Sequence, residues 1–324
     1  MSAPFFVTGT PRSGTKLLRA LIKQQPGLWI PDGETNFFPH FLTRARTYGD
    51  LAERRNFQRL AQDMARTKAY WYWESEGVAP TAEEWYAQCP GYRMPQVLEG
   101  LFRALYAREG APAGPWQRLR WGDKSPAHVE RLDVIARHFP ASRFVHIVRD
   151  PRDVALSAER AWGKHKLRTA QRWFDAVSAA RRVGRAIGSE RYLELRYEDL
   201  VRDPEREVAR VVAFLGAPFD PARVQLKRPS ENLGWAQGQK GVVSDNAGRF
   251  QRDMAERTRR QIEGLCGPLL DELGYAREFP NIPHWRLGAA AMQALKLRDG
   301  VHWLAFQRRA WGGWWHGLRF VSAR

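Results

Sequence analysis

The chain has 324 residues, and 52 Lys and Arg against 35 Asp and Glu give it a formal net charge of +17. Its 44% hydrophobic and 12% aromatic content excludes a disordered chain, no apolar run approaches the ~18 residues of a membrane span, and Cys89 and Cys266 are too few for a disulfide framework or a cysteine-rich metal site. The composition predicts a globular protein, and the basic balance predicts a surface that attracts anions such as nucleotides, nucleic acid, acidic lipids or acidic glycans.

A strand, a tight loop and a helix are expected within the first 25 residues. Residues 4–9 are apolar and β-prone, and apolar residues recur at helical spacing from Leu17 to Ile22. The loop between them, TGTPRSGTK at 8–16, would place backbone N–H groups and the positive end of a helix dipole around one point. This arrangement is typical of loops that bind phosphate-like groups.

Strands and helices alternate along the rest of the chain. The expected strands are 28–30, 119–122, 143–149 and 191–196. The expected helices are most of 35–110, a helix from the N-cap Ser125 to about His138, one from Asp150, 169–187, 204–215 and 250–273. Residues 220–248 are expected to form a loop. The alternation predicts an α/β fold with a parallel sheet flanked by helices on both faces.

Two motifs suit phosphate groups. Gly9 and Gly14 have the spacing of a nucleotide-kinase loop, but the lysine falls one residue late, at Lys16, which weakens the alternative of a P-loop NTPase or kinase. In RFVHIVRDPRDVALS, at 143–157, Arg149 ends a strand and Ser157 follows about two helical turns later. An arginine and a hydroxyl suit a phosphate monoester. The alternative is that Arg149 pairs with a neighbouring aspartate as part of a helix cap.

The motifs together resemble the sulfotransferases that use 3′-phosphoadenosine 5′-phosphosulfate (PAPS). The resemblance rests on PRSGT at 11–15, VRDPRDVALS at 148–157 and RYEDL at 196–200, in this order, and GET at 33–35 and DKSP at 123–126 are similar to segments of the tyrosylprotein and bacterial members. It covers roughly residues 4–280. It implies a P-loop-like α/β domain at 1–280 that transfers a sulfuryl group in line to an acceptor, without a metal.

The resemblance also implies which residues hold the donor. The residues expected at the 5′-phosphosulfate are Arg12, Ser13, Gly14, Thr15 and Lys16. Arg149 and Ser157 match residues that bind the 3′-phosphate, and Tyr197 matches one near the adenine, with a helix-start aromatic beside a capping Glu198 as its alternative. A loop that closes over the 3′-phosphate in relatives is similar to the segments around Lys240 and Arg249.

Glu34, Arg12 and Lys124 are the expected catalytic residues. An attacking hydroxyl must lose a proton, and Glu34 matches the base of the tyrosylprotein enzymes; its alternative is a cap for the helix expected from Thr35. Arg12 and Lys124 match residues that stabilise the transferring group, where charge develops; a solvated lysine is the alternative for Lys124. The histidines at 40, 128 and 146 are weaker candidates for the base.

Residues 281–324 are expected to form a basic, Trp-rich C-terminal extension. They carry seven Lys and Arg against Asp299, and five of the 14 tryptophans, including Trp311, Trp314 and Trp315. Such a segment suits peripheral contact with a membrane or stacking on sugars, and its alternative is a helix packed on the core.

The remaining expectations concern partners and location. We expect a small-molecule or glycan acceptor, with a carbohydrate or glycolipid favoured over a phenol or tyrosine, and no nucleic acid. A non-enzymatic basic module that binds membranes or nucleic acid is the third functional alternative, although no DNA-binding motif favours it. The chain lacks a charged leader followed by an apolar stretch, so we expect a cytoplasmic protein.

Overall fold

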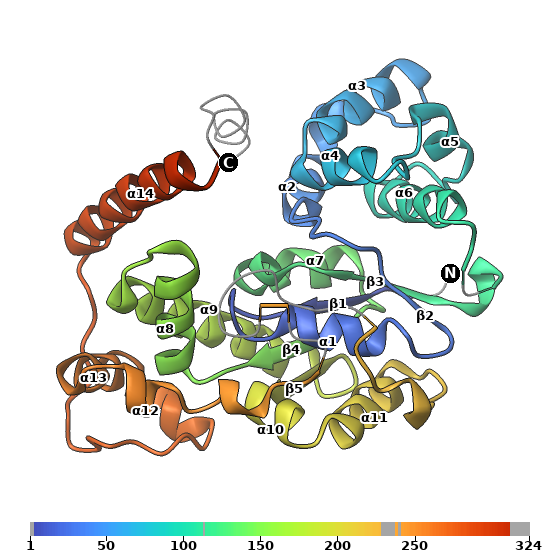
Figure 1. Ribbon diagram of the computed structural model, residues 1–324. Coiled ribbons are helices and arrows are strands. Elements are labelled where there is room, and N and C mark those ends of the chain that lie inside the picture. The colour runs from blue at the N-terminus through green and yellow to red at the C-terminus, as the bar shows by residue number, and fades with distance from the viewer. Residues whose placement is uncertain (1–2, 113, 228–236, 239–240, 312–324) are drawn as a thin grey trace.

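The computed structural model describes residues 3–112, 114–227, 237–238 and 241–311, and a five-stranded parallel sheet lies at its centre (Figure 1). The strands are β1 (Phe5–Thr8), β2 (Leu28–Trp29), β3 (Arg120–Lys124), β4 (Arg143–Val148) and β5 (Tyr192–Arg196). Their order is β2-β3-β1-β4-β5, and every neighbouring pair is parallel. The predicted α/β fold is therefore confirmed, and all five strands end at the same edge of the sheet.

Helices cover both faces of the sheet. In chain order they are α1 (Thr15–Ile22), α2 (Phe38–Thr43), α3 (Arg54–Ala65), α4 (Lys68–Ser75), α5 (Ala82–Ala87), α6 (Met94–Arg108), α7 (Leu132–His138), α8 (Pro151–Trp162), α9 (Lys166–Ile187), α10 (Tyr197–Arg202), α11 (Pro204–Leu215), α12 (Phe250–Asp253), α13 (Glu256–Glu272) and α14 (Ala289–Trp311). Successive side chains of a strand point to opposite faces. Phe6 accordingly joins a core with α2, α6 and α7, whereas Phe5 and Val7 join a second core with α1 and α11.

Helices α2 to α6 form a lobe on the same side of the sheet as α7, above β3 and β2 in the view of Figure 1. Their core is aromatic, with Trp73, Trp85 and Phe102 fully buried. Thr67 and Thr81 start α4 and α5 by accepting a hydrogen bond from a backbone N–H, as N-cap residues do. The helical prediction for residues 35–110 is confirmed.

Ser125 stands at the N-cap of a helical segment that runs to His138, as the sequence predicts, but its side chain makes no capping hydrogen bond. The segment Pro126–Arg131 is a 3₁₀-helix, and α7 begins only at Leu132. The Ser125 hydroxyl instead accepts a hydrogen bond from the backbone N–H of Asn36 at 3.0 Å. Asn36 has a φ of +53°, so its N–H faces the end of β3 rather than a local acceptor. The serine therefore ties β3 to the segment that follows β2.

The C-terminal extension contributes α14, which packs against α8 and α9 and lies at the periphery of the molecule (Figure 1). Asp299 is buried in this contact, where its carboxylate accepts hydrogen bonds from the backbone N–H of His165 at 2.8 Å and from the guanidinium of Arg168 at 2.6 Å. Within the described residues, no helix is long and apolar enough to cross a membrane. Trp314 and Trp315 lie outside the described residues.

Candidate functional site

The loop between β1 and α1 is shaped by close approaches that only glycine allows. A Cβ atom on Gly9 would lie 2.4 Å from the Ile147 carbonyl oxygen, and one on Gly14 would lie 2.4 Å from Cδ2 of Tyr197. Gly14 has a φ of +94°, and Arg12 has a φ of +75°, which is strained for a residue with a side chain. Because the first N–H groups of α1 have no acceptor within the helix, this bend has the geometry of the anion cradle that the sequence predicts.

Arg12 reaches from this loop to α8. Its Nε donates a hydrogen bond to Oγ of Ser157 at 3.0 Å, and its guanidinium lies 5.4 Å from the ring centre of Trp162. Ser157 is nearly buried, and since its oxygen accepts this bond, its own O–H can donate to a ligand. The structure thus brings together two predicted donor-binding residues that are 145 positions apart.

Arg149 lies directly after β4 and is only 4% exposed. Its Nη1 donates to the Arg12 carbonyl oxygen at 3.1 Å, its Nη2 donates to the carbonyl oxygen of Asn246, and its guanidinium stacks 4.4 Å from the ring centre of Tyr197. Its Nε is buried and donates to nothing within the described residues. The terminal nitrogens therefore hold two loops together, and Nε is the group left for an anion.

Asp153 anchors the segment that reaches Arg149 from the far end of the chain. Its carboxylate accepts hydrogen bonds from the backbone N–H groups of Gly248 at 2.7 Å and Phe250 at 2.9 Å, and lies 3.9 Å from the Arg149 guanidinium. The alternative in which Arg149 pairs with a neighbouring aspartate is thus represented only by this 3.9 Å contact with Asp153. Arg249 lies on the anchored segment, whereas Lys240 lies outside the described residues.

Tyr197 and Glu198 have different roles at the start of α10. Tyr197 is buried between the Gly14 loop and Arg149, close to the residues predicted to bind the nucleotide. Glu198 accepts hydrogen bonds from the backbone N–H of Asp150 at 3.0 Å and from the Tyr275 hydroxyl at 2.9 Å. Burial raises the pKa of Glu198. Its carboxylate therefore joins β4 to the C-terminal part of the domain.

Glu34 and Lys124 form an ion pair beside the loop, with 2.6 Å between Nζ and Oε1. The lysine side chain is 1% exposed and the glutamate side chain 35% exposed. Burial lowers the pKa of Lys124 to about 8; the Glu34 carboxylate opposes this shift, and the charges of Arg19 and Lys16 add to it. Burial alone would raise the pKa of Glu34, but Lys124, Lys16 and Lys68 outweigh it and lower that pKa.

Arg19 and Trp73 hold the segment that carries Glu34, and sequence reasoning missed both. Arg19 donates to the Gly33 carbonyl oxygen and pairs with the Asp32 carboxylate, each at 3.3 Å, while the Trp73 indole donates to the Asp32 carbonyl oxygen at 3.2 Å. Arg19 lies on α1, directly after the anion loop. The helical spacing that placed it on α1 gave no signal that it contacts a segment fourteen residues away.

The three histidines do not join this site as bases. His128 is buried beside the rings of Phe6 and Phe38 and 3.2 Å from Asp123, and His146 is buried within β4 with its Nδ1 2.6 Å from the hydroxyl of Tyr192. His40 lies on α2, where burial lowers its pKa. The anion loop, Arg149, Tyr197, Lys124 and Glu34 meet at the carboxyl edge of the sheet, where open α/β sheets bind ligands.

A family model described as the sulfotransferase family matches residues 4–221. A protein-tyrosine sulfotransferase of Drosophila melanogaster is 24% identical over 224 residues, which cover 67% of this chain and 38% of that protein. An omega-hydroxy-beta-dihydromenaquinone-9 sulfotransferase of Mycobacterium bovis is 36% identical over 178 residues, which cover 49% of this chain and 42% of that protein. The chain therefore spans well under half the length of these relatives.

Two solved structures share the fold. The sulfotransferase domain of the Synechococcus olefin synthase has a TM-score of 0.54 at 21% identity, and the alignment covers 81% of this chain and 95% of that domain. The sulfotransferase domain of the curacin biosynthetic pathway has a TM-score of 0.55 at 20% identity, and the alignment covers 86% of this chain and 99% of that domain. At this identity the likeness concerns the architecture, and it extends beyond the residues that the family model matches.

Proposed function

Since this chain belongs to the sulfotransferase family, we propose that it transfers a sulfuryl group from PAPS to an acceptor hydroxyl. The observation that carries the proposal is the meeting of an anion loop, a buried arginine and a Glu34–Lys124 ion pair at one edge of the sheet. A phosphate loop alone is common to many nucleotide-binding proteins. The ion pair beside it adds a group that can take a proton and a cation that can stabilise charge.

The residues present suit both anionic ends of the donor. The N–H groups at the start of α1, with Ser13, Thr15 and Lys16, would surround the 5′-phosphosulfate. The Nε of Arg149 and the hydroxyl of Ser157 are donors without another acceptor within the described residues, and would hold the 3′-phosphate. Tyr197 would lie near the adenine, and Arg249 is carried to the same place by the segment that Asp153 anchors.

PAPS supplies an activated sulfuryl group whose S–O bond to the 5′-phosphate breaks as a bond to the acceptor oxygen forms. In our proposal Glu34 accepts the proton of the acceptor hydroxyl. Its lowered pKa keeps it ionised at neutral pH, and Lys124 orients it. Arg12 and Lys124 stabilise the charge that grows on the bridging and sulfuryl oxygens, and the electron pair of the broken bond stays on the phosphate.

We propose a carbohydrate or glycolipid hydroxyl as the acceptor. The relatives support a hydroxyl acceptor, since their names include a protein tyrosine, a hydroxylated menaquinone and, for a mouse protein 30% identical over 162 residues, a carbohydrate. On α4, the partly exposed ring of Tyr72 lies against Gly33, next to Glu34, and can supply an apolar wall for a sugar ring. We also propose that the basic, Trp-rich C-terminal extension contacts a membrane surface.

The test is transfer of ³⁵S from labelled PAPS to three acceptor panels: neutral and acidic oligosaccharides with glycolipids, simple phenols, and tyrosine peptides. We expect label in the carbohydrate panel, and loss of transfer in Glu34→Gln with donor binding retained. Glu76→Gln, an exposed carboxylate at the end of α4, is the matched control and should keep full activity. Label confined to phenols or peptides would overturn the acceptor class, and equal activity of the two variants would overturn Glu34 as the base.

A further inference from the structure

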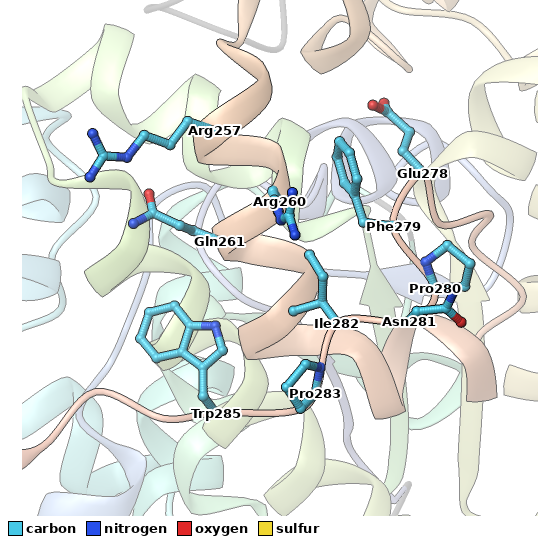
Figure 2. Close-up of a pocket in the computed structure, with 10 residues that line it drawn as sticks. All are labelled: Arg257, Arg260, Gln261, Glu278, Phe279, Pro280, Asn281, Ile282, Pro283 and Trp285. Carbon is cyan, nitrogen blue, oxygen red and sulfur yellow. The ribbon is translucent and has the colours of Figure 1, made fainter.

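A cavity of about 630 Å³ opens between α13 and the segment 278–285 (Figure 2), and none of the residues assigned to PAPS or the acceptor lines it. Its walls are Arg257, Arg260 and Gln261 of α13, and Phe279, Asn281 and Trp285 of the segment are among the residues opposite. Nothing in the proposed reaction uses these side chains. The volume is within the range of small-molecule binding sites.

Buried polar contacts fix the segment that forms one wall. The carboxylate of Glu263 is fully buried, binds the Arg152 guanidinium at 2.6 Å, and accepts the backbone N–H groups of Glu278 at 3.0 Å and Phe279 at 2.8 Å. Arg277 donates to the carbonyl oxygens of Phe279 and Ile282. The shape of the cavity is therefore set before any ligand binds, which reduces the entropy lost on binding.

Trp285 forms the end of the cavity. Its backbone N–H donates to the Gly264 carbonyl oxygen at 3.1 Å, and a Cβ on Gly264 would lie 2.3 Å from the indole nitrogen. One edge of the indole therefore rests on the backbone of α13, and the rest of the ring lines the cavity. Figure 2 shows Gln261 on the same side as the indole and Arg260 beside Ile282 and Phe279.

The cavity lining carries two arginines against one carboxylate. Arg257 and Arg260 are exposed and form no ion pair with any residue that the structure describes, and Arg260 lies 5.8 Å from the ring centre of Phe279. The acid in the lining, Glu278, pairs with Arg259 at 2.9 Å. Two unpaired guanidinium groups beside aromatic rings favour an anionic ligand such as a carboxylate or sulfate.

Most backbone N–H groups of the segment 278–285 already donate within the protein or are absent at prolines, which argues against a peptide that binds as an added strand. The N–H groups of residues 278, 279, 282 and 285 already donate within the protein, and residues 280 and 283 are prolines. Recognition by strand addition needs a row of free backbone groups. The groups still available are the side-chain amides of Gln261 and Asn281, the indole ring and the two arginines.

We propose that this cavity binds an acidic sugar unit, a uronate or a sulfated residue, within a glycan chain. A guanidinium takes the carboxylate or sulfate, the amides bond to hydroxyls, and the indole covers the apolar face of the sugar ring. The cavity would hold a chain at a distance from the sheet edge, and its ligand need not be the acceptor. The inference goes beyond the proposed reaction and does not depend on it.

The test is calorimetric titration of the full chain with a chondroitin sulfate tetrasaccharide, with maltotetraose and a glutamate peptide of equal negative charge as comparison probes. Arg260→Glu should weaken binding of the sulfated probe at least tenfold, and Gln261→Ala about threefold. Arg55→Glu makes the same charge change on the exposed side of α3, in the other lobe, and should weaken binding less than twofold. Each titration is repeated with saturating PAP present, so that binding of the probe to the donor loop does not contribute to the measured heat.

Three results of the titrations with the probes contradict the inference. No binding of the sulfated probe, or equal losses in Arg260→Glu and Arg55→Glu, would show that the cavity is no specific site. Equal binding of the peptide, with the same loss in Arg260→Glu, would replace the sugar by an acidic peptide. Failure of the protein to bind PAP would overturn the proposed reaction alone, since the comparison of the two arginine variants stands without it.

Discussion

We predict that the rate of sulfuryl transfer depends on pH through the buried side chain of Lys124, at the end of β3. Burial brings the pKa of Lys124 to about 8, below the usual value of 10.5, so its charge is lost as the pH rises through 8. If Lys124 stabilises the transferring group, kcat/KM falls about tenfold per pH unit above 8, to roughly a tenth of the plateau at pH 9. The acidic limb lies below pH 4.5, because the pKa of Glu34 is lowered from that value.

The variant Lys124→Arg shows whether deprotonation of Lys124 causes the loss of rate above pH 8. An arginine stays protonated throughout the measured range, so the alkaline limb should disappear below pH 10, although the larger group should lower the plateau. Lys124→Met should lose about 10²- to 10³-fold of the rate at pH 7, as when one stabilising donor is removed. Rates of ³⁵S transfer between pH 6 and 10 test both, with the surface variant Lys166→Arg as control. A wild-type rate that is flat to pH 10, or an alkaline limb unchanged in Lys124→Arg, would refute the reasoning.

Three further variants test the supports of the site. Arg19→Gln removes a positive charge near Lys124, so the pKa of Lys124 and the alkaline limb should move to higher pH. Because Arg19 also holds the segment that carries Glu34, kcat should fall several-fold while donor affinity is kept. An alkaline limb that does not move in the same pH series would contradict this. Gly14→Ala should cost about 1–3 kcal/mol of unfolding free energy in urea, because its Cβ meets the Tyr197 ring; a stable variant would be unexpected. Asp153→Asn weakens two loop anchors and should lower PAP affinity roughly tenfold by calorimetry; unchanged affinity would count against that loop.

Much of the fold could be predicted because its signals are local. The strands β1 and β4 are short apolar runs that are followed directly by Gly9 and Arg149. The helix α1 follows from its apolar spacing, and α11 from its apolar spacing and the proline at its first turn. The order of the strands across the sheet is set by contacts between distant segments. For that reason a parallel sheet was predictable, whereas its strand order and register were not.

The site was predictable where a motif lies on a single strand, loop or helix. The anion loop and Arg149 fall at strand ends, as expected, but the pairing of Glu34 with Lys124 spans 90 positions, and only the folded chain shows it. Arg19 and Asp153 act on segments elsewhere in the chain through one or two hydrogen bonds each. Such contacts leave no periodic trace in the sequence. Ser125 shows the same limit, because its acceptor role depends on the backbone turn at residue 36.

The most direct measurement of the central claim is titration of the protein with PAP and with adenosine 5′-phosphate, for wild type and Arg149→Ala. Hydrogen bonds from Arg149 and Ser157 to a 3′-phosphate are worth about 1.5–3 kcal/mol, so PAP should bind roughly 10- to 100-fold more tightly than adenosine 5′-phosphate. Arg149→Ala should remove this difference and leave the weaker affinity in place. If wild type fails to bind PAP, or binds both nucleotides equally, the account of this site as a PAPS-dependent sulfotransferase is contradicted.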